Sequence, residues 1–172
     1  MNKQQILDSI IDAEGGYVND PADSGGETMH GVTVKVARAS GYTGEMRELP
    51  RATAFDIYEK RYWHSVSADG LYALSPAIAA EAVDTAVNMG PTRAGQILQR
   101  SLNALHAVEL FVDGRVGPVT LQALEGYLAR RDAAILLRAM NCLQGAKYIE
   151  LTERRHKDKR FIYGWLKHRV KV

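Results

Sequence analysis

The apolar residues of this sequence recur mostly at intervals of three or four, the spacing of a helix with one buried face. In residues 3–13 one apolar stripe is followed by Gly15 and Gly16, where a helix end is expected. The same spacing, with proline or glycine near the ends of elements, predicts several further helices. Their approximate ranges are 34–40, 50–64, 75–90, 92–106, 118–130, 132–153 and 160–170. The expected fold class is therefore all-α.

One segment departs from the helical pattern. Residues 15–32 are rich in glycine, aspartate, asparagine and proline and contain few apolar positions. Irregular segments of this length inside a compact domain are usually functional. We expect a short irregular β-hairpin or loop here, directly after the first helix. A soft boundary near Gly90-Pro91 divides the chain into a loop-bearing half, residues 1–90, and a plainly helical half, residues 91–172.

Charge is distributed unevenly along the chain. The whole sequence carries a formal net charge of only +2, yet residues 154–172 are strongly basic, with Asp158 as their one acidic residue. A basic end of this kind predicts an anionic partner, which can be nucleic acid, a membrane surface or the acidic bacterial wall. The alternative is a solvated helix face without a partner.

The single cysteine and the N-terminus bear on the compartment. Cys142 cannot form an internal disulfide, and its place near Met140 and Leu143 predicts a buried, inert thiol. Acidic residues interrupt the N-terminal region where a secretory signal needs an unbroken apolar run, and no apolar stretch is long enough to span a membrane. We expect synthesis in the cytoplasm without a signal peptide and no membrane insertion. A target in the cell wall or periplasm then requires another route of delivery.

Glu14 is the most informative position. At about 100° per residue, it falls near the middle of the stripe formed by Ile6, Leu7, Ile10 and Ile11. A carboxyl group aimed at a core is unfavourable unless it is paired or neutral, and protonation of a glycosidic oxygen requires a neutral carboxylic acid. A buried ion pair with an arginine, or a helix end frayed into water, are the alternatives. The pattern nominates Glu14 as a general acid.

A second carboxylate would complete this chemistry, because inverting glycosidases use one to activate a water molecule. Asp23 lies nine residues after Glu14 in the irregular segment, with Asp20 as a competitor. Thr28 follows and is placed to hold the water through its hydroxyl group. The alternative is that both aspartates only form Asx-turns.

The run from Glu14 to Thr33, EGGYVNDPADSGGETMHGVT, closely resembles the opening motif of glycoside hydrolase family 108. Its members are N-acetylmuramidases with a lysozyme-like fold, found as phage endolysins and in bacterial genomes, often in prophages. The resemblance implies that Glu14 is the catalytic glutamate, and we count Tyr17 of the same motif as a substrate-binding candidate. The spacing to Asp23 is also similar to that of phage lysozymes, whose aspartate and a later threonine position the water. The interval to Thr28 is one residue shorter here, which leaves Thr33 as a substitute.

Two further segments are similar to parts of this family. Arg61-Tyr62-Trp63 resembles an aromatic-rich segment, and Trp63 is expected to stack on a sugar ring unless these aromatics belong to the core. Residues 84–90 resemble the lysozyme-like helix that lines the cleft opposite the glutamate. The resemblance implies that Asn88 binds a hydroxyl or N-acetyl group of the saccharide. Helix capping and interior hydrogen bonds are the alternative for Asp84 and Asn88.

From about Gly95 onward the chain resembles the small helical peptidoglycan-binding domain that follows the catalytic part of the family. The likeness rests on residues 113–124 and 161–169. It implies that residues 1–90 form a lysozyme-like catalytic domain, with residues 91–172 as a peptidoglycan-binding-type domain packed against it.

Motifs for other kinds of chemistry are missing from the sequence. The five histidines are scattered without metal-ligand spacing, and neither a Gly-x-Ser-x-Gly elbow nor a phosphate-binding glycine loop is present. We therefore expect no metal site and no cofactor.

The sequence thus predicts a peptidoglycan hydrolase that cleaves the β-1,4 bond between N-acetylmuramic acid and N-acetylglucosamine. Its partners are expected to be glycan strands rather than nucleic acid, and the resemblance alone implies help from a holin in crossing the inner membrane. Three rivals remain. They are a lytic transglycosylase, which needs no water-directing aspartate, a non-catalytic wall-binding or secretion-accessory protein, and a basic helical nucleic-acid binder. The oligomeric state is not indicated.

Overall fold

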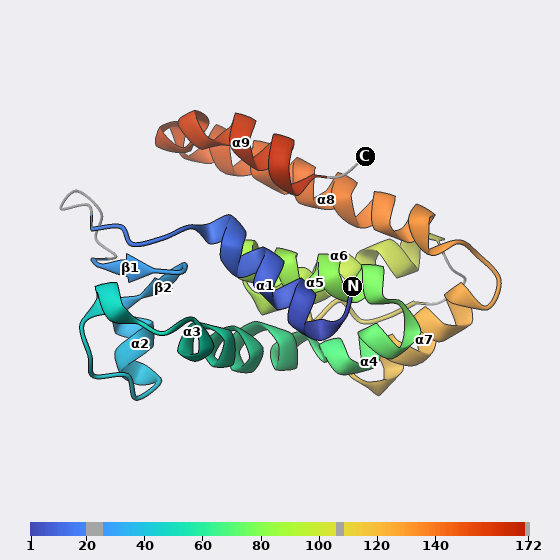
Figure 1. Ribbon diagram of the computed structural model, residues 1–172. Coiled ribbons are helices and arrows are strands. Elements are labelled where there is room, and N and C mark those ends of the chain that lie inside the picture. The colour runs from blue at the N-terminus through green and yellow to red at the C-terminus, as the bar shows by residue number, and fades with distance from the viewer. Residues whose placement is uncertain (20–25, 106–108, 171–172) are drawn as a thin grey trace. The chain divides into compact units, whose positions relative to one another are not determined.

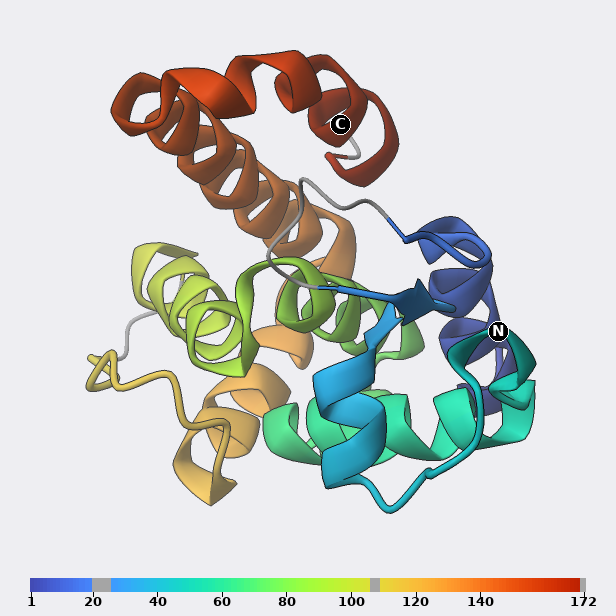
Figure 2. The ribbon, with the colours of Figure 1, turned by 90° about the vertical axis from the view of Figure 1, so that its left-hand side faces the viewer.

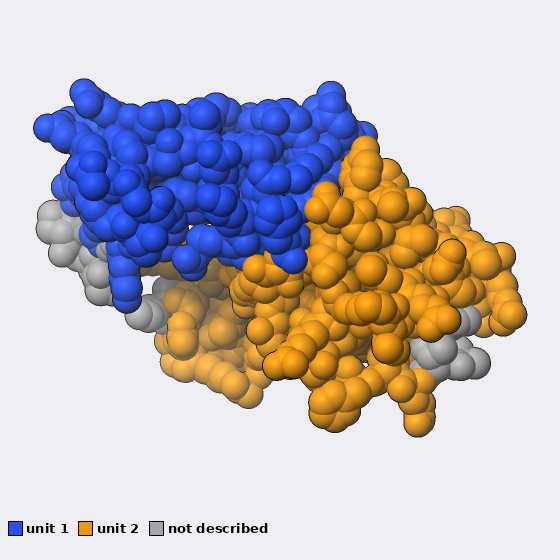
Figure 3. Space-filling view, turned by 90° about the horizontal axis from the view of Figure 1, so that it is seen from below, with its two compact units in different colours: residues 1–64 blue, residues 65–172 orange. Residues whose placement is uncertain are grey.

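The computed structural model of the protein describes residues 1–19, 26–105 and 109–170 (Figure 1). The chain forms two compact units, Met1–His64 and Ser65–Val172, shown in different colours in Figure 3. Both units are mostly helical, and a short β-hairpin follows the first helix. The predicted fold class is confirmed. The domain boundary expected near residue 90 stays a prediction.

The first unit contains three α-helices and a β-hairpin. Helix α1 spans Lys3–Glu14, strands β1 and β2 span Thr28–Met29 and Val32–Thr33, and helix α2 spans Val34–Ala39. A 3-10 turn η1, Met46–Glu48, precedes helix α3, Arg51–Tyr58. Strand β2 leads directly into α2 (Figure 2). The apolar stripe of α1 is buried as its spacing predicted.

Local sequence explains where α1 begins. The side chain of Asn2 accepts a hydrogen bond from the backbone N–H of Gln5, and the side chain of Gln5 accepts one from the backbone N–H of Asn2. This capping box satisfies two amide groups that a helix start leaves unpaired.

Ion pairs then attach α1 to α3. Arg51 contacts Asp8 at 2.9 Å and Asp12 at 2.7 Å. Hydrogen bonds from the side chain of Gln4 and then from Arg51 lower the pKa of Asp8. The carboxylates of Asp12 and Asp8 raise the pKa of Arg51 in turn.

The region predicted as one helix over residues 50–64 contains a change of helix type. After α3 the chain forms a π-helix η2, Glu59–Trp63, and a 3-10 turn η3, His64–Val66. A π-helix bonds residue i to residue i+5, so it brings Trp63 to the same face as Tyr58. Both side chains are buried, at 0% and 2% exposure. The wider turn therefore moves Trp63 into the core.

The second unit consists of α4 Ala68–Leu74, α5 Pro76–Met89, α6 Pro91–Leu105, α7 Pro118–Leu128, α8 Ala133–Arg154 and α9 Lys159–Arg169, with a 3-10 turn η4 at His156–Asp158. Three of these helices begin with proline, whose fixed φ suits a first turn. Ser75 caps α5 by accepting a hydrogen bond from the backbone N–H of Ile78. Helix α9 doubles back along α8 (Figures 1 and 2).

Two features of this unit differ from the sequence-based expectation. Helix α4 was not predicted, because its short sequence buries only Ala68 and Leu71 and shows no long apolar stripe. Cys142 was predicted to be a buried thiol, and this is wrong, because the residue is exposed on α8. Its neighbour Asn141 is buried instead, at 2% exposure. No helix in the described parts of the chain is long and apolar enough to cross a membrane.

The buried amide of Gln99 on α6 holds residues 113–115, which lie shortly before α7. Nε2 of Gln99 donates to Oδ1 of Asp113 at 2.9 Å and to the carbonyl oxygen of Arg115 at 3.1 Å. Its Oε1 accepts a hydrogen bond from the backbone N–H of Gly114 at 2.8 Å. The bond from Gln99, followed by that from the backbone N–H of Arg115, lowers the pKa of Asp113. This segment therefore packs closely on α6.

The close packing predicts that alanine destabilises the protein at Gly95 but not at Gly164. A Cβ atom at residue 95 of α6 would overlap the carbonyl group of Gly114, whose carbon lies 2.6 Å away. Gly95→Ala should lower the free energy of unfolding by about 1–3 kcal/mol, because backbone atoms have to shift. Gly164→Ala is the matched control, since residue 164 also lies in a helix but faces open space. It should be neutral or stabilise by up to about 1 kcal/mol. Urea unfolding of both variants checks this, and equal stability would contradict it.

Candidate active site

Glu14 is the last residue of α1, three positions after Ile11, the last buried residue of the helix. Its side chain is partly exposed, so the carboxyl group lies at the border between the apolar core and the surface. Gly15 follows with a φ of 86°, a conformation that favours glycine and ends the helix at this point. The helix thus delivers one carboxyl group to the edge of the first unit.

The turn of the β-hairpin lies directly against Glu14. Gly31, with a φ of 71°, approaches so closely that a Cβ atom there would lie 2.8 Å from Cβ and 3.0 Å from Cγ of Glu14. The same atom would overlap the hydroxyl group of Tyr58 from α3. That hydroxyl donates a hydrogen bond to the carbonyl oxygen of His30 at 3.1 Å. The end of α1, the turn and α3 therefore meet at Glu14, and only glycine fits at residue 31.

Backbone pairing extends the hairpin to the segment after Glu14. Val18 and Thr28 exchange two backbone hydrogen bonds of 2.8 Å, and Thr28 pairs with Thr33 across the strands. Residues directly opposite in antiparallel strands share a face, so Val18, Thr28 and Thr33 lie in one row. Val32 lies on the opposite face and is buried.

The two threonines have different environments. Oγ1 of Thr33 accepts a hydrogen bond from the backbone N–H of Val36 at 3.4 Å and so caps α2. Thr28 is partly exposed, and its hydroxyl donates to the carbonyl oxygen of Gly26 at 3.4 Å. Thr33 thus already has a structural role, which leaves Thr28 as the better candidate for binding water.

Tyr17 is held by two charged residues. Its hydroxyl donates a hydrogen bond to Oε1 of Glu27 at 2.6 Å, and the guanidinium of Arg47 lies 4.6 Å from the centre of its ring. Hydrogen bonding to Tyr17 is the main cause that raises the pKa of Arg47. The sequence analysis did not identify Arg47 as a partner of Tyr17, or the hydroxyl of Tyr58 as a partner of the hairpin turn. Helical spacing places an aromatic residue in the core but does not indicate what its hydroxyl group binds.

Trp63 is the predicted substrate-binding residue of the first unit that the core encloses. Trp63 is 0% exposed, and the ammonium of Lys3 lies 5.2 Å from its ring centre. A ring in this position has no face for a sugar. Asp23 and its competitor Asp20 lie outside the described residues.

Asn88 and Asp84 lie one turn apart on α5 in the second unit. Nδ2 of Asn88 donates to the carbonyl oxygen of Asp84 at 2.8 Å and to its Oδ2 at 3.4 Å. Oδ1 of Asp84 forms an ion pair of 2.8 Å with Nη1 of Arg169 from α9. Asn88 is partly exposed.

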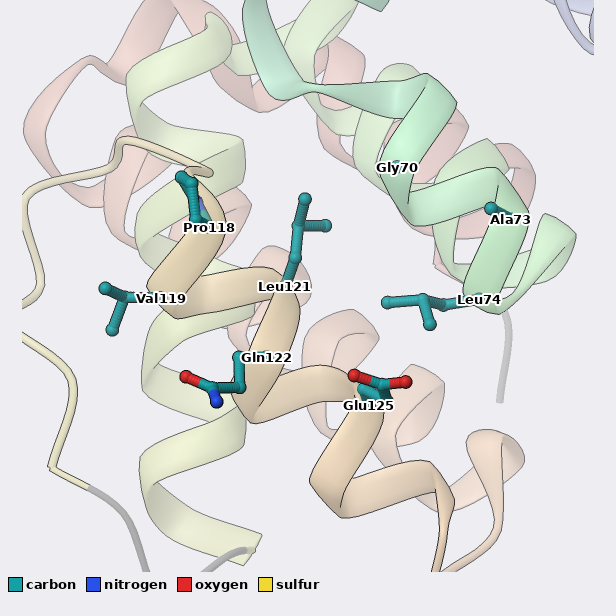
Figure 4. Close-up of a pocket in the computed structure, with 8 residues that line it drawn as sticks. All are labelled: Gly70, Ala73, Leu74, Pro118, Val119, Leu121, Gln122 and Glu125. Atoms are coloured by element: carbon teal, nitrogen blue, oxygen red, sulfur yellow. The ribbon is translucent and has the colours of Figure 1, made fainter.

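The second unit also has an open groove of about 490 Å³ between α4 and α7 (Figure 4). Leu74 and Leu121 project into it, and Glu125 supplies its one carboxylate. None of the predicted site residues lines this groove. Among the described residues, no group of three or more histidine, cysteine, aspartate or glutamate side chains is placed to hold a metal ion.

Residues 7–90 match the family described as Glycosyl hydrolase 108. This part of the chain belongs to the glycosyl hydrolase 108 family. Residues 93–170 match a second family, described as Predicted Peptidoglycan domain. The two matches identify a glycoside hydrolase of family 108 that acts on peptidoglycan.

The chain is also similar to a solved structure, that of Brucella abortus SagA, with a TM-score of 0.66 and 23% sequence identity. The match covers 98% of this chain and 96% of SagA. At this identity the likeness is one of fold. No curated protein sequence matches the chain.

The contact between Gly31 and Glu14 gives a test of the site. Gly31→Ala should lower both the free energy of unfolding and hydrolysis of peptidoglycan, because the new methyl group has to displace the stem of Glu14 or the hydroxyl of Tyr58. The expected loss of stability is about 1–3 kcal/mol from overpacking, in addition to the strain of a positive φ. Thermal unfolding and a turbidity assay with purified cell walls measure the two effects.

Gly41→Ala is the matched control for this experiment. Gly41 has a φ of 90°, and nothing lies within 4 Å of the position its Cβ would occupy. It shares the backbone strain without the overlap, so its activity should stay near that of the wild type. Equal loss of activity in both variants would show that the turn does not position Glu14.

Proposed function

We propose that the protein is an N-acetylmuramidase that hydrolyses the β-1,4 bond between N-acetylmuramic acid and N-acetylglucosamine. The observation that carries the proposal is the placement of Glu14, whose stem is fixed by the Gly31 turn while its carboxyl group is partly exposed. A general acid must be held in place and yet reach its substrate. An activity of this kind suits a phage or prophage endolysin that depends on a holin to reach the wall.

In the proposed reaction, Glu14 donates its proton to the glycosidic oxygen as the bond to the anomeric carbon breaks. Asp23 accepts a proton from a water molecule, and the oxygen of that water bonds to the anomeric carbon. Attack from the opposite side of the sugar gives inversion, which requires the two carboxyl groups to lie about 6.5–9.5 Å apart. Thr28 orients the water through its hydroxyl, and the partial exposure of this residue supports the role.

Two further residues are proposed to bind the glycan strand. Tyr17 offers an aromatic ring whose orientation is fixed by Glu27 and Arg47. Asn88 offers an amide on α5 that is partly exposed. Trp63 is left out of the proposed site, because its ring is buried.

The basic end of the chain supports attraction to the wall. Helix α9 has no buried residue, and Lys159, Arg160, Lys167 and Tyr163 are all exposed on it. Tyr163 is 76% exposed. We define these four residues as the basic face of α9. Carboxylates and phosphates of a bacterial wall would attract such a face through charge, and the residues fall within the segment that matches the peptidoglycan family.

Muropeptide analysis tests the reaction. The wild type should release fragments with reducing N-acetylmuramic acid ends, and Glu14→Gln should reduce kcat by about 10²- to 10⁴-fold, the usual contribution of a general acid. Asp23→Asn should also lose activity if the water needs a base. Mass spectrometry of the released fragments is the measurement.

Glu48→Gln serves as the control, because Glu48 is an exposed glutamate in the same unit. It should cleave walls at the wild-type rate. Fragments with 1,6-anhydro ends would identify a lytic transglycosylase instead. Full activity of Glu14→Gln would refute the proposed acid, whatever the products.

A salt series tests the basic face of α9. Changing Lys159, Arg160 and Lys167 together to glutamine should lower the fraction of protein bound to purified cell walls several-fold at low salt. The difference should vanish at about 1 M salt, where the Debye length falls to about 3 Å. The triple change Lys35→Gln, Lys60→Gln and Arg131→Gln removes the same charge from exposed positions elsewhere. If both triple variants bind equally weakly, only net charge matters and the face has no special role.

A further inference from the structure

The ion pair between Arg169 and Asp84 joins the last helix of the chain to α5. Nη1 of Arg169 lies 2.8 Å from Oδ1 of Asp84, and the two side chains are only 15% and 23% exposed. An ion pair that is largely removed from water keeps a defined geometry better than a pair on an exposed surface. The carboxylate of Asp84 is therefore held at one oxygen.

The other oxygen of this carboxylate faces Asn88. Two atoms of Asp84 contact the amide of Asn88. They are the main-chain carbonyl oxygen and the side-chain Oδ2, and both are hydrogen-bond acceptors. Only the NH₂ group of an asparagine can donate to them. The amide of Asn88 is thus fixed with Nδ2 toward Asp84, and its Oδ1 points away from that residue.

We propose that Arg169 and Asp84 are positioning residues that present Oδ1 of Asn88 as a hydrogen-bond acceptor to the glycan. The matching group on the substrate is a donor, either a sugar hydroxyl or the N–H of an acetamido group. Arg169 fixes the carboxylate, the carboxylate and the main-chain carbonyl oxygen of Asp84 together fix the amide, and the amide binds the sugar. This inference rests on the proposed role of Asn88.

We call the contacts from Arg169 through Asp84 to Asn88 the relay. It joins the two segments of the chain that match different families. Asp84 and Asn88 lie in the segment that matches glycosyl hydrolase 108, whereas Arg169 lies in the segment that matches the peptidoglycan family. A second bond crosses in the same way, because Nε2 of Gln144 on α8 donates to Oγ1 of Thr85 at 3.2 Å. Both Gln144 and Thr85 are 0% exposed. The C-terminal segment is therefore part of the substrate-binding apparatus and not only a tether to the wall.

The decisive variant is Asp84→Asn in the full-length chain. The substituted side chain keeps an oxygen for Arg169 but turns an NH₂ group toward Asn88. Two NH₂ groups repel each other, so Nδ2 of Asn88 keeps only its 2.8 Å bond to the main-chain carbonyl oxygen of residue 84, and its Oδ1 should lose its fixed orientation toward the substrate. The dissociation constant for a tetrasaccharide of alternating N-acetylglucosamine and N-acetylmuramic acid should rise about tenfold, the size of one hydrogen bond. Calorimetry in a Glu14→Gln background measures binding without cleavage.

Arg169→Ala and Arg169→Lys form the second arm of the experiment. Arg169→Ala should weaken binding of the tetrasaccharide by a similar factor, and lysine should restore part of it. In an Asn88→Ala background neither Asp84→Asn nor Arg169→Ala should weaken binding further, because residues that act through one another are not additive. A merely structural role of the pair would give additive losses. Lys147→Ala is the control, since it removes another partly buried ion pair, with Glu150, from the same unit.

The outcomes separate this inference from the proposed function. Wild-type affinity in both Asp84→Asn and Arg169→Ala, additive losses with Asn88→Ala, or no binding of the tetrasaccharide by the Glu14→Gln reference would each overturn the relay. Release of no fragments by the wild-type chain would refute the muramidase proposal while the binding data still decide the relay. Circular dichroism confirms that each variant is folded before its affinity is compared.

Discussion

The close approach of the hairpin turn to Glu14 is the constraint on which the proposed chemistry depends. Glycine at residue 31 lets backbone lie against the stem of a side chain that ends a helix. The hydroxyl of Tyr58 secures the same turn from α3. Three elements that are distant in sequence thereby meet at the stem of Glu14, at a helix end that would otherwise fray. Rigid placement of this sort is what catalytic groups require of a scaffold.

The sequence was a good guide to this fold where local rules decide the structure. The stripe of α1, the cap at Ser75 and the prolines that begin α5 and α7 each follow from helix geometry and capping. The helical region predicted to residue 64 is present, but its change to a π-helix over Glu59–Trp63 was not predicted, because a π-helix depends on packing that buries Trp63. The exposed position of Cys142 likewise depends on which face of α8 the other helices cover. Periodicity alone does not supply that information.

The candidate site was predictable in part. Glu14 is identified by its place on an apolar stripe, and the glycines after it indicate a loop that folds back. The partners of Tyr17 and the ion pair of Arg169 with Asp84 join residues far apart in sequence, for which a single chain gives no signal. The sequence therefore nominates Glu14 as the chemical group, and the structure shows which residues lie against its stem.

The exposed thiol of Cys142 has a practical consequence. Because it is the one cysteine in the chain and stands on the surface of α8, a fluorescent label can be attached there without changing any residue. A dye at that point would sit on the helix along which α9 packs. Its polarisation would report in real time when the protein passes from free tumbling to an immobilised state on a sacculus.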